Sequence, residues 1–213
     1  MSSQRIEKIR TSLEQMYASR SDLLFHGWHH ITFVTCKSIE FGLEFAIDAE
    51  LLEAAALTHD LNYIVDVKSS VDDGQALRAQ VLTDAGFSTE EINDIEAIVH
   101  DSSSEHSGGD ISDAAKALSD ADKLFKVLPV GPMILSSRYI TETKGDIEKW
   151  ADRIIRYQKP LLESGRYFYT ESAKEKYLHW AKLNLAWVAM VQDSLQDPDI
   201  QAFLEDCKRL NYI

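Results

Sequence analysis

Residues 54–63 read AAALTHDLNY, an apolar run that ends with a histidine and an aspartate side by side. Apolar residues from Leu52 onward recur at i, i+3, i+4 and i+7, which predicts a helix with Asp48 as its N-cap and His59 at the end of its apolar stripe. Neighbouring helical side chains point about 100° apart, so one apolar face cannot hold both His59 and Asp60. Because both are costly to bury without a partner, the pair favours a bound cation.

Helical patterns continue from this stretch in both directions, and nothing alternates as a β-strand does. Gly86 is a stop signal, and STEE at 88–91 is a capping box that joins Ser88 to Glu91. The fold class is therefore predicted to be all-α. The expected helices span residues 4–19, 28–45, 48–59, 71–85, 88–100, 111–128, 146–164 with a kink at Pro160, and 171–195, with a short helix after Asp197-Pro198. MILSSRYI at 133–140 receives no assignment, and TETKGD at 141–146 is expected to be a polar turn.

Length and composition are those of one folded domain. The 213 residues, 45% hydrophobic and 27% charged, predict a single domain over 1–213, with a core over about 20–130 and a C-terminal helical part over about 131–213. Lys and Arg number 22 against 35 Asp and Glu, a net charge of −13 that opposes binding to bulk nucleic acid. A small phosphorylated substrate remains compatible, because a metal ion and a few local cations can reverse the field in one cleft.

Cysteine usage and hydropathy set the expected compartment. Cys36 and Cys207 lie far apart without CxxC spacing, and the chain starts MSSQRIEKIRTSLEQM, which does not resemble a signal peptide. No run approaches 18 apolar residues, so we expect no membrane span and a cytoplasmic, reduced protein.

Histidines and carboxylates gather in three motifs: HGWHH at 26–30, THD at 58–60 and LSDADKL at 118–124. Two imidazoles and two carboxylates suit a divalent ion such as Mn, Co, Ni, Fe, Mg or Zn, and the cysteine positions exclude a thiolate site. On the helix expected over 111–128, Asp122 shares a face with apolar residues, whereas Asp120 lies roughly 200° around the axis. Only Asp122 is therefore expected to face the other ligands. No organic cofactor is predicted.

The order His30, His59-Asp60 and Asp122 is similar to the H…HD…D signature of the HD superfamily of metal-dependent phosphohydrolases. The likeness includes GWHHITFV, ALTHDLNY and SDADKL, about residues 20–130, and YTESAKEK resembles the small single-domain bacterial members. The resemblance implies a compact multi-helix bundle in which His30, His59, Asp60 and Asp122 bind the metal. It also implies hydrolysis of a small phosphoester, often a nucleotide, by a metal-activated water, with Asp60 among the catalytic residues.

Further residues follow from the same resemblance. His100 ends its helix about where many members place a histidine that binds a second metal or the substrate phosphate, and a helix C-cap explains it equally well. Several relatives carry an arginine three residues after the first ligand, where this chain has Phe33. Phosphate neutralisation would then come from Lys123, Lys68 or Arg78, and we favour Lys123 because it adjoins the last ligand.

Other polar residues have two explanations each. Asp66 follows the HD pair by six residues and is a candidate general base or a loop cap. His26, one helical turn before the first ligand, is either a group that supports the ligands or substrate, or a core histidine. One cleft could collect His29 with the other histidines, and in the alternative without a metal His29 is exposed and His30 is a buried histidine that donates to a backbone carbonyl. Trp28 is expected to pack in the core, and His106 to be solvated.

Two alternative functions stay open. One is an HD-type di-iron oxygenase, which needs additional histidines between the HD pair and the last aspartate, where only His100 and His106 are available. The other is a non-catalytic binding module, which would normally lose ligands. The aromatic stripe of Tyr177, Trp180 and Trp187 predicts a packing surface for the core or for a partner in a homodimer.

Overall fold

The structure is a computed structural model that describes residues 3–103 and 110–210, and in these ranges it contains helices and no strand. The predicted all-α class is confirmed. The elements in chain order are α1 (Gln4–Ala18), α2 (Trp28–Gly42), α3 (Ala49–Thr58), α4 (Leu61–Val65), the 3-10 helix η1 (Val71–Gly74), α5 (Gln75–Ala85), α6 (Thr89–Ser102), α7 (Asp113–Lys126), α8 (Gly131–Thr143), α9 (Ile147–Glu163), α10 (Glu171–Ser194) and α11 (Pro198–Arg209).

The predicted helix boundaries have the expected chemistry. Asp48 accepts hydrogen bonds from two backbone N–H groups at the start of α3. Ser88 and Glu91 form the reciprocal capping box at the start of α6. Gly86 ends α5 with a φ of 101°, a left-handed conformation that glycine adopts without steric cost. Local sequence signals therefore determine where these helices begin and end.

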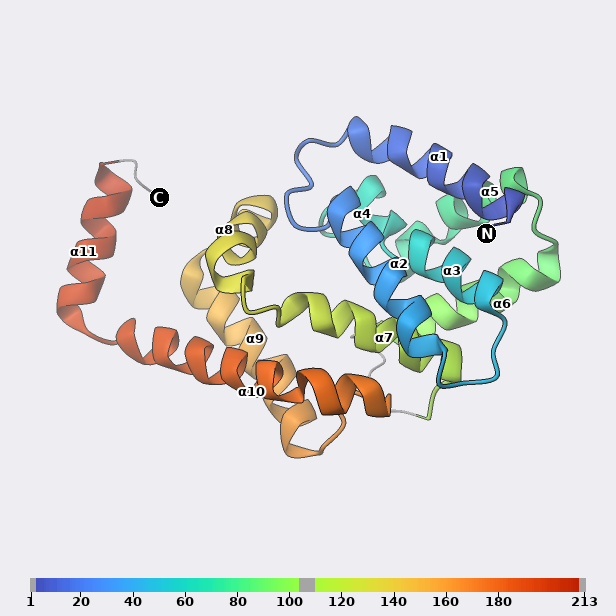
Figure 1. The fold of residues 1–213 in the computed structure, drawn as a ribbon. Helices are drawn as coiled ribbons and strands as arrows, with labels where there is room; N and C mark the ends of the chain where they lie inside the picture. Colours follow the sequence, from blue (N-terminus) through green and yellow to red (C-terminus); the bar gives the residue numbers. More distant parts are fainter. Residues whose placement is uncertain (1–2, 104–109, 211–213) are drawn as a thin grey trace.

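The core is built around α2, which packs against α3 on one side and α7 on another (Figure 1). Ile31, Val34 and Phe41 of α2 are completely buried. The three consecutive alanines of α3 at 54–56 are completely buried between its neighbours, and short side chains at a contact let helices approach closely. This close packing brings the ends of α2, α3 and α7 to one place in the molecule.

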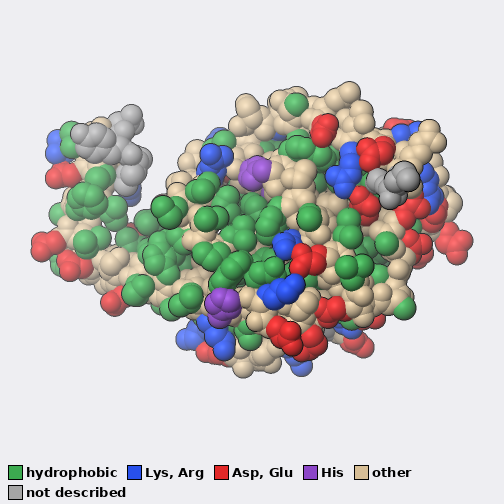
Figure 2. All heavy atoms as spheres, in the orientation of Figure 1, with side chains coloured by type: hydrophobic (Ala, Val, Ile, Leu, Met, Phe, Trp, Pro, Cys, Tyr) green, Lys and Arg blue, Asp and Glu red, His purple; other side chains and the backbone are tan. Residues whose placement is uncertain are grey.

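A second, smaller apolar cluster lies where α9 packs against α10, around Trp150, Ala151 and Val188. Figure 2 shows hydrophobic side chains gathered on one face over α8 and α10, and the exposed apolar residues of these two helices include Met133, Ile134, Leu183 and Met190. Helix α11 extends away from the body at the end of α10 (Figure 1) and buries none of its residues.

Two segments differ from the sequence-based expectation. The unassigned stretch and the start of the expected polar turn together form α8, and Glu142 lies buried in its last turn. The carboxylate of Glu142 tolerates burial because it accepts hydrogen bonds from the backbone N–H groups of Phe25 and His26. The predicted helix over 71–85 is η1 followed by α5.

Helix α9 continues through Pro160 to Glu163. No helix of the described ranges combines the length and apolar character needed to cross a membrane.

Candidate metal centre

His59 and Asp60 occupy the break between two helices. Helix α3 ends at Thr58, His59 caps it, and Asp60 has φ −105° and ψ 21° before α4 begins. The break frees the two side chains from helical spacing, so that His59 Nε2 and Asp60 Oδ2 lie 3.4 Å apart. Consecutive residues therefore face the same point, as their sequence pairing predicts.

The ring of His59 is held in one orientation. Its Nδ1 lies 2.8 Å from the carbonyl oxygen of Ala56. A carbonyl can only accept, so Nδ1 carries the proton and Nε2 presents a lone pair. Burial lowers the pKa of His59, which favours the same neutral form. This is the state in which an imidazole binds a metal ion.

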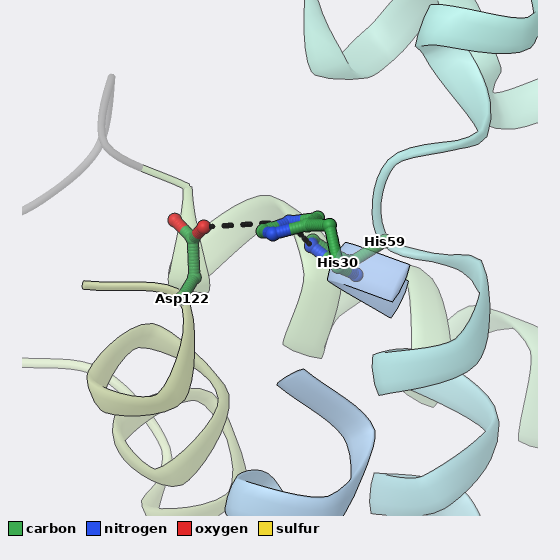
Figure 3. Close-up of side chains that lie close together, drawn as sticks. All are labelled: His30, His59 and Asp122. Atoms are coloured by element: carbon green, nitrogen blue, oxygen red, sulfur yellow. Dashed lines mark hydrogen bonds and ion pairs between the residues drawn. The ribbon is translucent and has the colours of Figure 1, made fainter. Parts of the chain in front are cut away.

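His30 reaches the same point from the first turn of α2 and is completely buried. Its Nε2 lies 3.2 Å from Nε2 of His59 and 3.0 Å from Oδ2 of Asp60. The ring of Phe125 packs against the imidazole in an edge-to-face arrangement, with 4.5 Å between ring centroids. Figure 3 shows the two imidazoles together, with Asp122 facing them from another helix.

Asp122 projects from α7, and its Oδ1 lies 3.7 Å from His30 Nε2. The helical phase predicted for Asp122 is thereby confirmed. One turn further along α7, Lys126 Nζ lies 2.5 Å from Oδ2 of Asp122. His30, His59 and Asp122 each offer one ligand atom within 4.8 Å of the others, so the group could hold a metal ion.

The electrostatics of the cluster favour a cation. Although burial opposes ionisation, the imidazoles of His59 and His30 hold the pKa of the Asp60 carboxyl well below its usual range. Lys126, followed by His30, likewise lowers the pKa of Asp122 against the effect of burial. Two ionised carboxylates thus face one ammonium group.

Asp60 Oδ2 also points to a missing partner. It is buried without a well-aligned hydrogen bond from any described residue, although His30 Nε2 is close. A buried charged oxygen of this kind is costly unless something positive contacts it. Two imidazole nitrogens and two carboxylates are the donor set that borderline and hard divalent ions accept. The residues present therefore fit a divalent metal.

Asp120, by contrast, faces away from the cluster and is completely buried. Its carboxylate accepts hydrogen bonds from the N–H groups of Tyr169 and Thr170, at 2.7 to 2.9 Å, and from the Thr170 hydroxyl. Burial raises the pKa of Asp120 to about 6. Asp120 therefore fastens the start of α10 to α7.

Lys126, rather than Lys123, is the lysine beside the ligands. Lys123 is one residue after Asp122 and points elsewhere: its Nζ is buried 4.5 Å from the centroid of the Tyr169 ring. Burial lowers the pKa of Lys123 to about 8. Helical spacing could have identified Lys126 from the sequence. A residue four positions after Asp122 lies on the same face of the helix, whereas a residue one position after it does not.

The other predicted phosphate-binding cations lie outside the cluster. Arg78 is buried in an ion pair with Glu96, at 2.7 Å, and donates to the carbonyl of Val71. It is therefore a structural residue that joins α5 to α6 and η1, which corrects its proposed role. Lys68 is exposed and lines a neighbouring groove.

Asp66 and His100 are not brought to the cluster. Asp66 is exposed and its Oδ1 accepts the backbone N–H of Lys68 at 2.7 Å, which is the loop-cap alternative. The side chain of His100 is 47% exposed and its Nδ1 lies 3.2 Å from the carboxylate of Asp101. Neither residue lines the cavity at the ligands. His106 lies outside the described residues.

His26 contributes to more of the site than the sequence suggested, because its side chain lines three neighbouring cavities. It is buried, its Nδ1 contacts Oε1 of Glu142 at 2.5 Å, and its ring stacks on Tyr63 at 3.7 Å. The ring centroids of His26 and His30 are 5.8 Å apart. His29 is exposed and is not collected in the cluster, and Trp28 packs on Tyr17 against the core, as expected for Trp28.

Three hollows therefore meet at His26 and Tyr63. One, of about 90 Å³, contains His59, Asp60 and Asp122. A second, of about 190 Å³, lies between α7, α8, α9 and α10. The third is an open groove of about 530 Å³ whose charged lining consists of Lys68, Lys149, Asp152, Arg153 and Arg156. Cations thus line a groove next to the cluster in a protein of net charge −13.

Comparisons with known proteins bear on the fold. No family model and no curated protein matches the chain. A crystal structure from Lactobacillus plantarum is similar, with a TM-score of 0.67 and 17% identity over 92% of this chain and 97% of its own. Bacillus subtilis YpgQ, crystallised in complex with ADP, is similar with a TM-score of 0.60 and 21% identity over 90% of this chain and 99% of its own. Both likenesses support the all-α architecture over nearly the whole chain.

Proposed function

We propose that this protein is a metal-dependent phosphohydrolase of the HD type that cleaves a nucleotide or a related small phosphorylated metabolite. The observation that carries the proposal is the grouping of His30, His59 and Asp122 at the wall of an open cavity, with Asp60 Oδ2 3.0 Å from His30 Nε2. These residues come from three separate helical segments, in the order that resembles the HD signature. Their donor chemistry fits a divalent ion.

The chain's own residues would each have a defined task. His59 and His30 present Nε2 atoms to the ion, and Asp60 and Asp122 present carboxylate oxygens. A bound divalent ion supplies a water of lowered pKa and positive charge beside the phosphate. Lys126 orients Asp122 through their ion pair and adds a second positive charge at the same cavity.

The surroundings support a substrate with phosphate and an organic part. The groove that begins at His26 carries Lys68, Arg153 and Arg156, which suit a charged phosphate chain. The structurally similar YpgQ was crystallised with ADP, and this agrees with a nucleotide as the substrate class. The acidic surface elsewhere opposes long nucleic acids.

The test is metal analysis of the purified full chain, followed by chelation, reloading with Mn, Co, Ni, Fe, Mg or Zn one at a time, and a panel of nucleotides and sugar phosphates. We expect one exchangeable divalent ion per chain and release of phosphate or pyrophosphate that chelation stops and the ion restores. The variant His29→Gln, next to the ligand His30 but exposed, is the matched control and should behave as wild type.

Hydrolysis that persists in chelated, metal-free protein would overturn the mechanism. Two irons per chain together with consumption of oxygen would replace it by the oxygenase. Absence of hydrolysis with every metal and substrate would favour a binding module.

A further inference from the structure

The cavity of about 190 Å³ between α7, α8, α9 and α10 has no task in the chemistry above. It holds several times the space that a single water needs. It shares His26, Tyr63 and Lys126 with the cavity that contains the metal ligands. A group inside it could therefore belong to the same molecule as a phosphate at the ligands.

The walls of this cavity are aromatic. Tyr139, Trp150, Tyr157 and Tyr167 line it from three different segments of the chain. Trp150 and Tyr167 are buried, at 7% and 1% exposure, so their rings are held in place. Aromatic walls of this kind favour a planar ring by stacking and edge-to-face contact.

An amide pair in the lining provides polar groups of both kinds. Asn184 Nδ2 of α10 donates to Oε1 of Gln158 of α9 at 3.2 Å, and Gln158 is buried at 8% exposure. Among the described residues neither Nε2 of Gln158 nor Oδ1 of Asn184 has another hydrogen-bond partner. Free amide N–H groups and the free carbonyl oxygen of Asn184 thus remain at the lining, and donors and acceptors together are what the edge of a heterocycle satisfies.

A third polar group points to a ligand independently. Lys123 is 6% exposed, lines the same cavity, and its Nζ is buried without a hydrogen-bond partner in the described part of the chain. The face of the Tyr169 ring, 4.5 Å from Nζ, offsets part of the cost of burying this amine, and a bound acceptor would complete its hydrogen bonding.

We propose that this cavity is the subsite for the planar heterocyclic part of the substrate, a nucleobase, with Gln158 and Asn184 reading its edge and Lys123 contacting one of its acceptors. The proposal deepens the proposed function, on which it rests for the phosphate attached to the ring. It makes the three residues positioning and specificity groups rather than catalytic ones.

The cavity can be filled by design. Gly131 is buried and lines the cavity, and a Cβ added there meets no atom within 4 Å. Gly131→Leu therefore extends a side chain into free space. Ser137→Leu places the same side chain on an exposed position of the same helix and is the matched control.

Binding is measured by titration calorimetry with metal-free full-length protein, so that the contribution of the base to affinity is measured without hydrolysis of the ligand. The four common nucleoside 5′-monophosphates are compared with ribose 5-phosphate, which has the same phosphate and sugar without the base. We expect at least one nucleotide to bind about tenfold or more tightly than ribose 5-phosphate. Gly131→Leu should abolish this preference, Gln158→Leu and Asn184→Leu should reduce it, and Ser137→Leu should leave it unchanged.

Affinity for ribose 5-phosphate should stay within about twofold in all variants, which also shows that they fold. Equal binding of every nucleotide and ribose 5-phosphate to wild type, or an equal loss of both in Gly131→Leu, overturns the subsite. If the base preference is found and no phosphoester is hydrolysed, the subsite stands and the proposed function falls. If hydrolysis is found without the base preference, the proposed function stands and the subsite falls.

Discussion

Glu142 and His26, 116 positions apart in the sequence, are joined through two hydrogen bonds to one carboxylate, which accepts a third from Phe25. Oε1 of Glu142 contacts Nδ1 of His26, and Oε2 accepts the backbone N–H groups of Phe25 and His26. The contact fastens the last turn of α8 to the segment before α2. It thereby positions His26, which lines the cavity at the candidate metal ligands, the aromatic cavity between α7, α8, α9 and α10, and the cationic groove.

Replacing this carboxylate should cost stability in a pH-dependent way. His26 lowers the pKa of Glu142 below its usual 4.5, against the effect of burial, so the contribution of the ionised group is present above about pH 4.5 and is lost as pH falls through the folded-state pKa. We expect Glu142→Gln to lower the free energy of unfolding by about 1–3 kcal/mol at pH 7. Urea unfolding at several pH values checks this.

The difference between wild type and Glu142→Gln should shrink as the pH is lowered below 4.5. Glu148→Gln, an exposed change on the next helix, should be nearly neutral at every pH. A Glu142→Gln effect that is constant with pH would show that the shape of the side chain, and not its charge, matters.

Loss of either residue of the HD pair should remove the metal and leave the fold. His59→Ala and Asp60→Ala each delete a ligand at the break between α3 and α4, outside the apolar clusters. We expect metal content below about one tenth of wild type after dialysis, with unchanged helical circular dichroism. One tightly bound ion per chain in both variants would refute the assignment.

The two aspartates of LSDADKL should separate metal binding from stability. Asp122→Ala should lose the metal, because Asp122 faces His30. Asp120→Ala should bind metal within a few-fold of wild type but lower the free energy of unfolding by about 2–4 kcal/mol, because it removes the buried carboxylate that accepts hydrogen bonds at the start of α10. Calorimetric titration measures the metal affinity of both variants, and urea unfolding measures their stability. Loss of metal in Asp120→Ala together with retention of metal in Asp122→Ala would contradict the structure.

Two lysines of α7 provide a matched comparison for the charge beside the ligands. Lys126 pairs with Asp122, whereas Lys116 pairs with Asp113 at the far end of the helix, at 2.8 Å. We expect Lys126→Ala to lower kcat/KM for a hydrolysed phosphoester by roughly tenfold to a hundredfold, and Lys116→Ala to have little effect. Equal kinetics for the two variants would remove Lys126 from the site.

The helix boundaries and the phase of α7 were accessible from sequence because their signals are local, whereas the grouping of His30, His59, Asp60 and Asp122 followed from the resemblance to the HD signature. The capping box of Ser88 and the glycine at 86 specify boundaries within one turn of chain. The phase of α7 placed Asp122 correctly because apolar neighbours mark the side of a helix that faces the core. Such patterns need no knowledge of distant segments.

The residues that sequence reasoning missed depend on partners far along the chain. Glu142 looked like part of a polar turn because the groups that satisfy it lie before α2. Asp120 looked peripheral because the backbone that it binds begins about fifty residues later, at Tyr169. A buried carboxylate is indistinguishable from an exposed one until the donors around it are known.

His30, His59 and Asp122 meet only after α2, α3 and α7 have packed, so an ion that needs all three recognises the folded chain alone. Such an ion shifts the folding equilibrium by mass action, by about 2.7 kcal/mol at a hundredfold excess over its dissociation constant. The melting temperature would then vary with the free concentration of the ion. At a low free concentration of the ion, a larger fraction of the molecules would be unfolded and accessible to proteases. The cellular half-life of the protein would therefore depend on the concentration of available metal.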